Sequence, residues 1–260
     1  LLSLTPTRKL IGLFSSIFVL MFLGDLQIKS FHNLFGIQEL PDLVAILFTL
    51  FVTVIITNAY NLIDGIDGLA GGLGVIASFV FGLIFLFNDD AQYAILSFTL
   101  LGALLAFLKY NFNPASIFMG DTGSLVIGLF FSILCIRLIN EGVNIPNDQK
   151  YVNKGPFISI VILAIPLFDT FRVFFIRIFS GYHPLRPDRN HIHHTLLDLG
   201  LGHKKSTLIL YTYSVIIAFL SYFMIDMSLG LSIFLLSIIV LGSMSIPFIL
   251  IRIKNTKSEK

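Results

Sequence analysis

Long apolar stretches alternate with short polar segments along most of this chain. A helix that crosses a membrane needs about 20 apolar residues, and fewer where the bilayer thins or the helix ends are amphipathic. The pattern predicts eight such helices, over Leu10–Gly24, Leu43–Thr57, Leu73–Asn88, Ala91–Lys109, Leu125–Ile139, Phe157–Phe179, Thr207–Asp226 and Leu229–Ile253. The expected fold is an all-α, polytopic membrane protein in which residues 1–260 form one membrane domain.

The lysines and arginines gather on one side of these predicted spans. If residues 1–9 lie inside, alternation also places 58–72, 110–124, 180–206 and 254–260 inside. Thirteen of the 17 basic residues then lie on or next to the inside face, as the excess of Lys and Arg in cytoplasmic loops requires. The segment between Asp25 and Asp42 falls outside, where we expect a short hairpin.

Composition supports a membrane protein and excludes some other classes. The chain is 56% hydrophobic and only 12% charged, whereas soluble domains carry about 25% charged residues. A net charge of +2 is too small to indicate a nucleic-acid partner. The single cysteine, Cys135, excludes an internal disulfide.

The first polar segment with candidate chemistry follows the second predicted span. Asn58, Asn61, Asp64 and Asp67 recur at every third position, and side chains with this spacing meet on one surface of a helix. Carboxylates at the edge of a membrane are costly and are functional candidates by default. The alternative interpretation is a polar loop without chemistry.

A second polar segment, residues 109–124, lies before the fifth predicted span. Asn113 precedes Pro114 and should end the preceding helix. Asp121 then opens the next helix beside Gly120 and Gly123. Free backbone N–H groups at a helix start favour anions, and a carboxylate there is suited to hold Mg²⁺ that bridges phosphates. A simple helix cap is the alternative.

A third polar segment combines an acid with basic and aromatic nitrogen groups. Asp169 and Arg172 are spaced to form an ion pair. The following loop, residues 181–195, carries Arg186, Arg189, His191, His193 and His194. Arginine forks match phosphate oxygens, and histidine can donate to phosphate or sugar oxygens. Zinc is a weaker alternative because no cysteine lies nearby, and contact with anionic lipid is another.

Three motifs, in this order, resemble glycosyltransferase family 4, the WecA/MraY-like polyprenyl-phosphate N-acetylhexosamine-1-phosphate transferases. They are Asn58–Ala70 (NAYNLIDGIDGLA), Phe118–Ser124 (FMGDTGS) and Arg186–His194 (RPDRNHIHH). The third motif is similar to the branch that transfers GlcNAc-1-phosphate, because it lacks the run of three histidines of the muramoyl-pentapeptide branch.

The resemblance implies a specific reaction and location. The protein would transfer N-acetylhexosamine-1-phosphate from a UDP-sugar, UDP-GlcNAc above all, to undecaprenyl phosphate and release UMP. The reaction would require Mg²⁺, with Mn²⁺ as a possible substitute. It would take place on the cytoplasmic face of the bacterial inner membrane, as the first membrane step of cell-envelope polysaccharide synthesis. A homodimer is left open.

The resemblance also assigns roles to residues. Asn61 and Asp121 are similar to the metal ligands, Asp67 to a uracil contact and Phe118 to the residue that stacks on the base. Asp64 and Asn111 resemble nucleotide-side residues of the pocket, beside Asn58. Arg186, Arg189, His191, His193 and His194 resemble the loop that binds the sugar and diphosphate. The catalytic candidates are Asp64, Asp67, Asp121 and His193.

One departure from the family pattern concerns the start of the chain. Leu4–Leu10 looks like the segment that follows an acceptor-side pair of aspartates in the family, and that pair should lie just before Leu1. We therefore expect a sequence that lacks its N-terminal spans, and expect the 260 residues alone to be inactive.

Two other functional classes compete with the transferase. An ion-coupled transporter could use Asp64, Asp67, Asp121 and Asp169 as a relay, but coupling acids are expected near the bilayer midplane. An intramembrane aspartyl protease carries Gly-x-Gly-Asp on a span, and Phe118 stands where that motif needs its first glycine.

Overall fold

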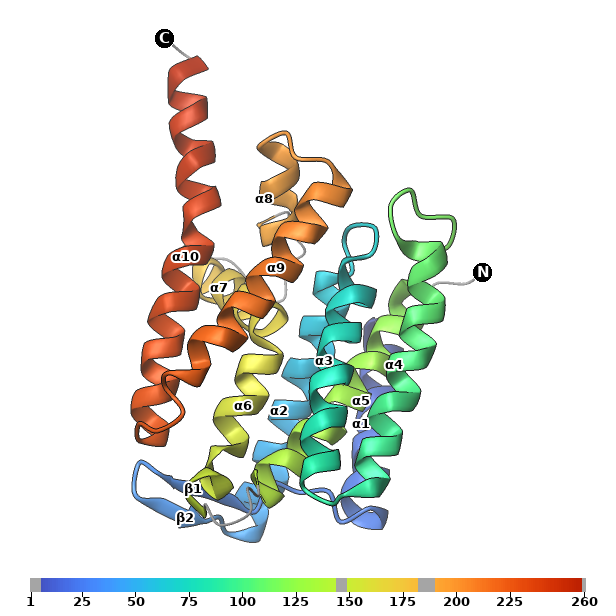
Figure 1. Cartoon of the computed structure of the whole chain (residues 1–260), viewed down its shortest axis with the longest axis vertical. Coiled ribbons are helices and arrows are strands. Elements are labelled where there is room, and N and C mark those ends of the chain that lie inside the picture. Colours follow the sequence, from blue (N-terminus) through green and yellow to red (C-terminus); the bar gives the residue numbers. More distant parts are fainter. Residues whose placement is uncertain (1–5, 144–148, 182–189, 259–260) are drawn as a thin grey trace.

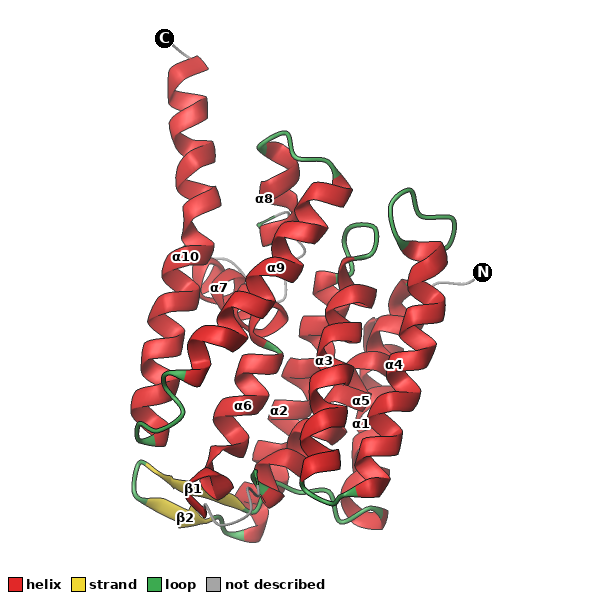
Figure 2. Ribbon diagram, in the orientation of Figure 1, coloured by secondary structure: helices red, strands yellow, loops and turns green. Residues whose placement is uncertain are grey.

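The computed structural model describes residues 6–143, 149–181 and 190–258. Helices and one small hairpin make up this part of the chain (Figures 1 and 2). In chain order they are α1 (Pro6–Leu23), β1 (Ser30–Leu34), β2 (Ile37–Glu39), α2 (Asp42–Ile63), α3 (Leu69–Phe87), α4 (Ala91–Asn111), α5 (Gly120–Glu141), the 3₁₀ helix η1 (Gln149–Lys154), α6 (Gly155–Ile162), α7 (Ala164–Phe179), α8 (Ile192–Asp198), α9 (His203–Tyr222) and α10 (Leu229–Ser258).

The predicted all-α, multi-pass fold is confirmed. Among the described residues, six helices are long and apolar enough to cross a membrane, namely α2, α3, α4, α5, α9 and α10. The pair α6–α7 would make a seventh span, and the apolar part of α1, Ile11–Leu23, is shorter. The α2–α3 and α4–α5 connections and α8 lie at one end of the bundle, and the β1–β2 hairpin lies at the other (Figure 1).

The prediction of one continuous span over Phe157–Phe179 is wrong. The chain bends by 83° between α6 and α7, so α7 lies across the bundle (Figure 1). Pro166 lies in the first turn of α7. It has no N–H to bond the carbonyl of Ile162, and its ring would clash with that carbonyl in a continuous helix.

Helix bounds near the first polar segment also differ from the prediction. α2 continues to Ile63 and therefore carries Asn58 and Asn61, whereas Asp64 and Asp67 lie in the turn before α3. The four side chains are thus not one helical row. Gly68 caps the start of α3 with φ of 79°, a left-handed conformation that glycine adopts without strain.

Two apolar cores hold the bundle together. One lies between α2, α3, α4 and α5 and contains Tyr60, Phe81 and Phe131, with the Tyr60 and Phe131 rings 4.7 Å apart. The other lies between the start of α3 and α6, α8, α9 and α10. Because α3 contributes to both cores, the polar turn before it lies where the two halves meet.

α2 and α5 approach closely at Gly128. A Cβ atom at Gly128 would lie 2.6 Å from Cα of Thr57 and 3.2 Å from Cβ of Tyr60. Helices in a membrane have little hydrophobic drive to associate, so small residues that admit close backbone packing stabilise their contacts. This approach sets the separation of α2 and α5 below the polar end of the bundle.

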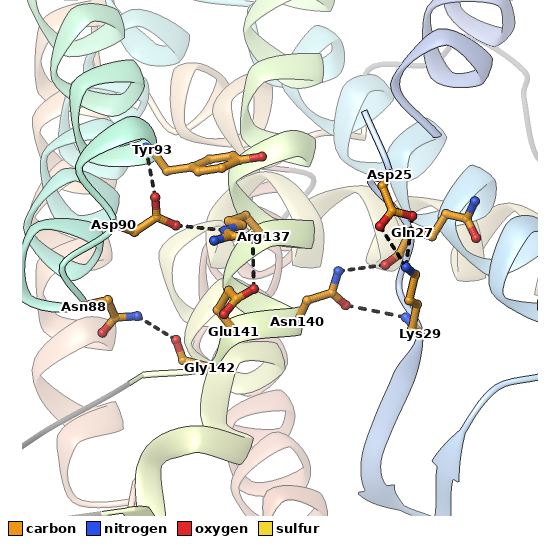
Figure 3. A network of polar contacts seen from close by, with 10 residues as sticks. All are labelled: Asp25, Gln27, Lys29, Asn88, Asp90, Tyr93, Arg137, Asn140, Glu141 and Gly142. Carbon is orange, nitrogen blue, oxygen red and sulfur yellow. Dashed lines mark hydrogen bonds and ion pairs between the residues drawn. The ribbon is translucent and has the colours of Figure 1, made fainter. Parts of the chain in front are cut away.

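A polar network fixes the opposite end of α5 (Figure 3). The Arg137 guanidinium donates to Asp90 at 2.8 Å and lies 3.0 Å from Glu141. Asn140 donates to the carbonyl of Gln27 at 2.7 Å. The expected hairpin after residue 25 is present as β1–β2, and these contacts join the segment before it to α5.

Gly128→Ala should separate α2 from α5, because the atom that the new Cβ would meet belongs to the Thr57 backbone and cannot rotate away. We expect a loss of about 1–3 kcal/mol of stability, as for other overpacked interiors, measured as a lower melting temperature in detergent. Gly102→Ala is the matched control, since a Cβ there meets no atom within 4 Å. An unchanged melting temperature for Gly128→Ala would contradict the proposed close packing.

Candidate functional site

A cavity of about 310 Å³ opens at the end of the bundle where α2, α4 and α5 meet their connecting loops. Its lining residues are Asn61, Asp64, Gly65, Ile66, Asp67, Asn111, Phe118, Gly120, Asp121 and His203. The first two polar segments of the sequence therefore converge on one site. Asn58 lies one turn before Asn61 on α2 and is not among the described residues that line the cavity.

Asn61 and Asp121 are in direct contact across the cavity floor. The Asn61 amide Nδ2 donates to Asp121 Oδ1 at 3.2 Å and to Ser124 Oγ at 2.8 Å. Both donor contacts use Nδ2, and Asn61 Oδ1 accepts no hydrogen bond from the residues the structure describes. The Asn61 amide, near the end of α2, thus lies against the Asp121 carboxylate in the first turn of α5.

Asp64 is half-buried in the same cavity. Within the described part of the chain its carboxylate makes no hydrogen bond or ion pair. Burial alone raises the pKa of Asp64 from 3.8 to about 6. A half-buried carboxylate without a partner is typical of a group that acts on a ligand.

Asp67 has a different environment. Its Oδ2 accepts from Asn113 Nδ2 at 2.8 Å and from the Ala115 N–H at 3.2 Å, and Oδ1 lies 3.2 Å from His203 Nδ1. Burial raises the pKa of Asp67, but the hydrogen bonds from Asn113, Ala115 and His203 outweigh burial and lower it. Asp67 therefore stays ionised and holds the 112–119 loop against the α2–α3 turn.

Asn111 also holds this loop. Its Oδ1 accepts from the Gly68 N–H at 3.0 Å and its Nδ2 donates to the Ile117 carbonyl at 2.9 Å. Both ends of the amide are used, so Asn111 shapes the cavity wall. Phe118, at the end of the same loop, is 79% exposed at the cavity and is free to stack on a planar ligand.

The histidine segment is anchored by buried Asp169 of α7. The Asp169 carboxylate lies 2.8 Å from His191 Nδ1 and accepts from the Ile192 N–H at 3.0 Å. The predicted Asp169–Arg172 pair is present at 3.0 Å, and Arg172 also donates to the Asn190 carbonyl. Asp169 therefore fixes the start of α8. Arg186 and Arg189 lie outside the described residues.

His193 lies against the α2–α3 turn beside the cavity. It is 1% exposed, and a Cβ atom at Gly65 would lie 2.0 Å from its Nε2. Neither ring nitrogen has a hydrogen-bond partner among the described residues. Burial, with a smaller contribution from neighbouring His194, lowers the pKa of His193 to about 3, so the imidazole is neutral at physiological pH. The His193 and His194 rings lie 4.2 Å apart.

His203 is a cavity residue that the sequence interpretation missed. It begins α9 and lines the cavity beside Asp67. The available signal was a histidine followed by Lys204 and Lys205 in a loop assigned to the same side as the other polar segments. Nothing in the spacing connects it to Asp67, which lies far away along the chain.

The cavity suits a magnesium ion better than zinc. Mg²⁺ prefers oxygen ligands, keeps several waters and takes one or two carboxylates, which matches Asn61 Oδ1 and the Asp121 carboxylate. Over residues 6–143, 149–181 and 190–258, no group of three His, Cys, Asp or Glu side chains is placed to hold a metal, as a structural zinc site would need.

Asp64→Asn should change how stability depends on pH. With a folded pKa of about 6 against 3.8 unfolded, the folded state retains a proton that the unfolded chain has released, so stability falls as pH rises through this window. Asparagine does not ionise. The melting temperature of the variant should therefore rise relative to the parent between about pH 4 and pH 7. If the melting temperatures of variant and parent differed by the same amount at every pH in that range, this account of Asp64 would be refuted.

Asp169→Asn should loosen α8. The new amide would replace a carboxylate that pairs with His191, Ile192 and Arg172. Breaking such a buried charged network costs about 3–5 kcal/mol of stability. Amide hydrogen exchange over Ile192–Asp198 should accelerate, while exchange in α2 and α5 stays unchanged. Asp198→Asn, at the exposed end of α8, is the matched control. Equal exchange in parent and Asp169→Asn would contradict the anchoring role.

The chain shares its sequence pattern with a known family and with several curated proteins. The family model described as "Glycosyl transferase family 4" matches residues 1–139, which include the cavity from α2 to α5. The "Probable undecaprenyl-phosphate N-acetylglucosaminyl 1-phosphate transferase" of Bacillus subtilis (strain 168) is 38% identical over 186 residues, 72% of this chain and 50% of that protein.

Two further relatives have related names. The "Decaprenyl-phosphate N-acetylglucosaminephosphotransferase" of Mycolicibacterium smegmatis is 38% identical over 71% of this chain and 48% of its own length. The "Undecaprenyl-phosphate alpha-N-acetylglucosaminyl 1-phosphate transferase" of Escherichia coli (strain K12) is 31% identical over 77% of this chain and 54% of its own length. The chain spans about half the length of these curated relatives. With the family match, the motifs and the multi-pass fold in agreement, the chain belongs to glycosyl transferase family 4.

Proposed function

We propose that this protein transfers GlcNAc-1-phosphate from UDP-GlcNAc to undecaprenyl phosphate and releases UMP. The contact between Asn61 and Asp121 at the cavity floor carries the proposal. It places two oxygen-bearing side chains, suited to a magnesium ion between phosphates, in the same cavity as Asp64, which has no partner among the described residues. The names of the relatives support GlcNAc as the sugar and a polyprenyl phosphate as the acceptor.

The reaction exchanges one phosphorus–oxygen bond for another. An oxygen of the lipid phosphate attacks the β-phosphorus of UDP-GlcNAc, and the bond from that phosphorus to the UMP oxygen breaks. Magnesium held by Asn61 and Asp121 would neutralise charge on the phosphates, which is the main requirement of such transfers. The side chains of the cavity bind and orient the two substrates.

Each cavity residue then has a role that its surroundings support. Exposed Phe118 stacks on the uracil. Asp67, engaged by Asn113 and Ala115, holds the loop that carries Phe118 and borders the base. Asp64 accepts a hydrogen bond from the nucleotide. Binding of the sugar and diphosphate is assigned, as expected from the sequence motif, to His191, His193 and His194, and to Arg186 and Arg189 outside the described residues.

The location of the cavity supports the proposed meeting of the substrates. The α2–α3 and α4–α5 loops lie at one end of the bundle (Figure 1), and the sequence assigns most of the lysines and arginines to that side. That excess marks the cytoplasmic face, where UDP-GlcNAc is available and the lipid phosphate lies at the membrane edge. The ion-coupled transporter has no such support, because Asp64, Asp67 and Asp121 line one terminal cavity and Asp169 is fully engaged.

Asp121→Asn should abolish the magnesium dependence of UDP-GlcNAc binding. Loss of an outer-shell partner already costs roughly 10–100-fold in metal affinity, and loss of a direct ligand should cost at least as much. We expect calorimetric affinity for UDP-GlcNAc to fall at least about tenfold, to the value that the parent shows in EDTA. Asp42→Asn, the same change at the opposite end of α2, should behave as the parent. Magnesium-dependent binding retained by Asp121→Asn would overturn the metal role.

A further inference from the structure

One face of α9 holds the turn between α2 and α3. His203, Thr207 and Tyr211 are spaced four residues apart and so lie in one row along the helix. The Thr207 hydroxyl donates to the Asp67 carbonyl at 2.9 Å, and the Tyr211 hydroxyl donates to the Gly68 carbonyl. The first residue of the row, His203, lies at the cavity.

The His203 imidazole is held by Asp67 through one nitrogen only. Nδ1 lies 3.2 Å from Asp67 Oδ1 and 3.4 Å from the Asp67 backbone nitrogen. A proton on Nδ1 would face the carboxylate, whereas an unprotonated Nδ1 would accept from the backbone N–H. In either tautomer Nδ1 is committed to Asp67, and the ring orientation is the same.

The other ring nitrogen remains for a ligand. Nε2 of His203 makes no hydrogen bond with any residue in the described ranges, and the side chain is 41% exposed at a cavity that it lines. A histidine fixed at Nδ1 by a carboxylate and open at Nε2 is a common arrangement where an imidazole acts on a ligand. His203 thus meets the geometric requirement for a binding residue.

The position of His203 indicates which part of a bound ligand it would contact. Asp67 Oδ1 holds His203, while Asp67 Oδ2 holds Asn113 and Ala115 in the loop that ends at exposed Phe118. The Asn61–Asp121 contact belongs to the floor between α2 and α5. A ligand with a planar base on Phe118 and phosphates near Asn61 and Asp121 would present its nucleoside to His203.

We propose that His203 is a nucleotide-binding residue whose Nε2 hydrogen-bonds the nucleoside part of the UDP-sugar, with Asp67 as its positioning residue. This inference rests on the proposed function and adds a specificity determinant that lies outside the three sequence motifs. In this assignment the Asp67 carboxylate orients His203 and the Phe118 loop together, so one acid aligns two contacts to the nucleoside.

Two conservative substitutions separate binding from positioning. The amide of glutamine reaches about where Nε2 lies, and the amide of asparagine reaches about where Nδ1 lies. His203→Gln should retain UMP affinity within about threefold, whereas His203→Asn should weaken it about tenfold, the effect of one hydrogen bond to a ligand. The reverse order, or parent affinity in both variants, would overturn the proposal.

The affinities for UMP and UDP show which part of the nucleotide His203 contacts. Binding of these nucleotides by the parent chain tests the proposed function separately. A contact to the nucleoside weakens UMP and UDP by the same factor in His203→Asn, whereas a loss confined to UDP would place the contact on the β-phosphate and reject the assignment. Lys205→Ala, exposed at the same helix start, is the control and should stay within about twofold. If the parent binds no uridine nucleotide, both proposals fall. If the parent binds them and both His203 variants bind with the same affinity, the His203 proposal falls and the proposed function stands.

Discussion

The close approach of α2 and α5 is the contact on which the site depends. With no side chain at Gly128, the backbones come near enough for Thr57 and Tyr60 to pack directly on α5. The same approach brings Asn61, near the end of α2, against Asp121 and Ser124 in the first turns of α5. Because helices in a membrane gain little from hydrophobic association, the separation of these two polar groups is set by steric fit.

The acids at this end of the bundle divide into two kinds. Asp67 and Asp169 are each surrounded by donors, and both join a distant segment to the cavity: Asp67 holds the 112–119 loop and His203, and Asp169 holds the start of α8. Asp64 is unpaired in the described chain, and Asp121 accepts from Asn61 while its side chain lies exposed at a helix start. The cavity therefore combines carboxylates that maintain its shape with carboxylates presented to a ligand.

The break between α6 and α7 has a functional consequence. A straight helix over Phe157–Phe179 would carry Asp169 along the bundle axis, whereas the 83° bend turns α7 across it. In this orientation Asp169 reaches His191, and α8 packs so that His193 meets Gly65. One proline near the start of α7 thus accounts for the placement of the histidine segment beside the α2–α3 turn.

The membrane fold, the family and the common end of the polar segments could be predicted from the sequence, because apolar length, basic-residue bias and motif order are properties of local sequence. The sequence also placed Asn61, Asp64 and Asp121 in one group. Three features emerged only in the folded chain: the break in the 157–179 span, the engagement by described donors of Asp67 but not of Asp64, and the position of His203 in the site. The physical reason is that these outcomes depend on helix packing and on partners distant along the chain: Asp67 and His203 are 136 residues apart and meet only because α9 lies against the α2–α3 turn.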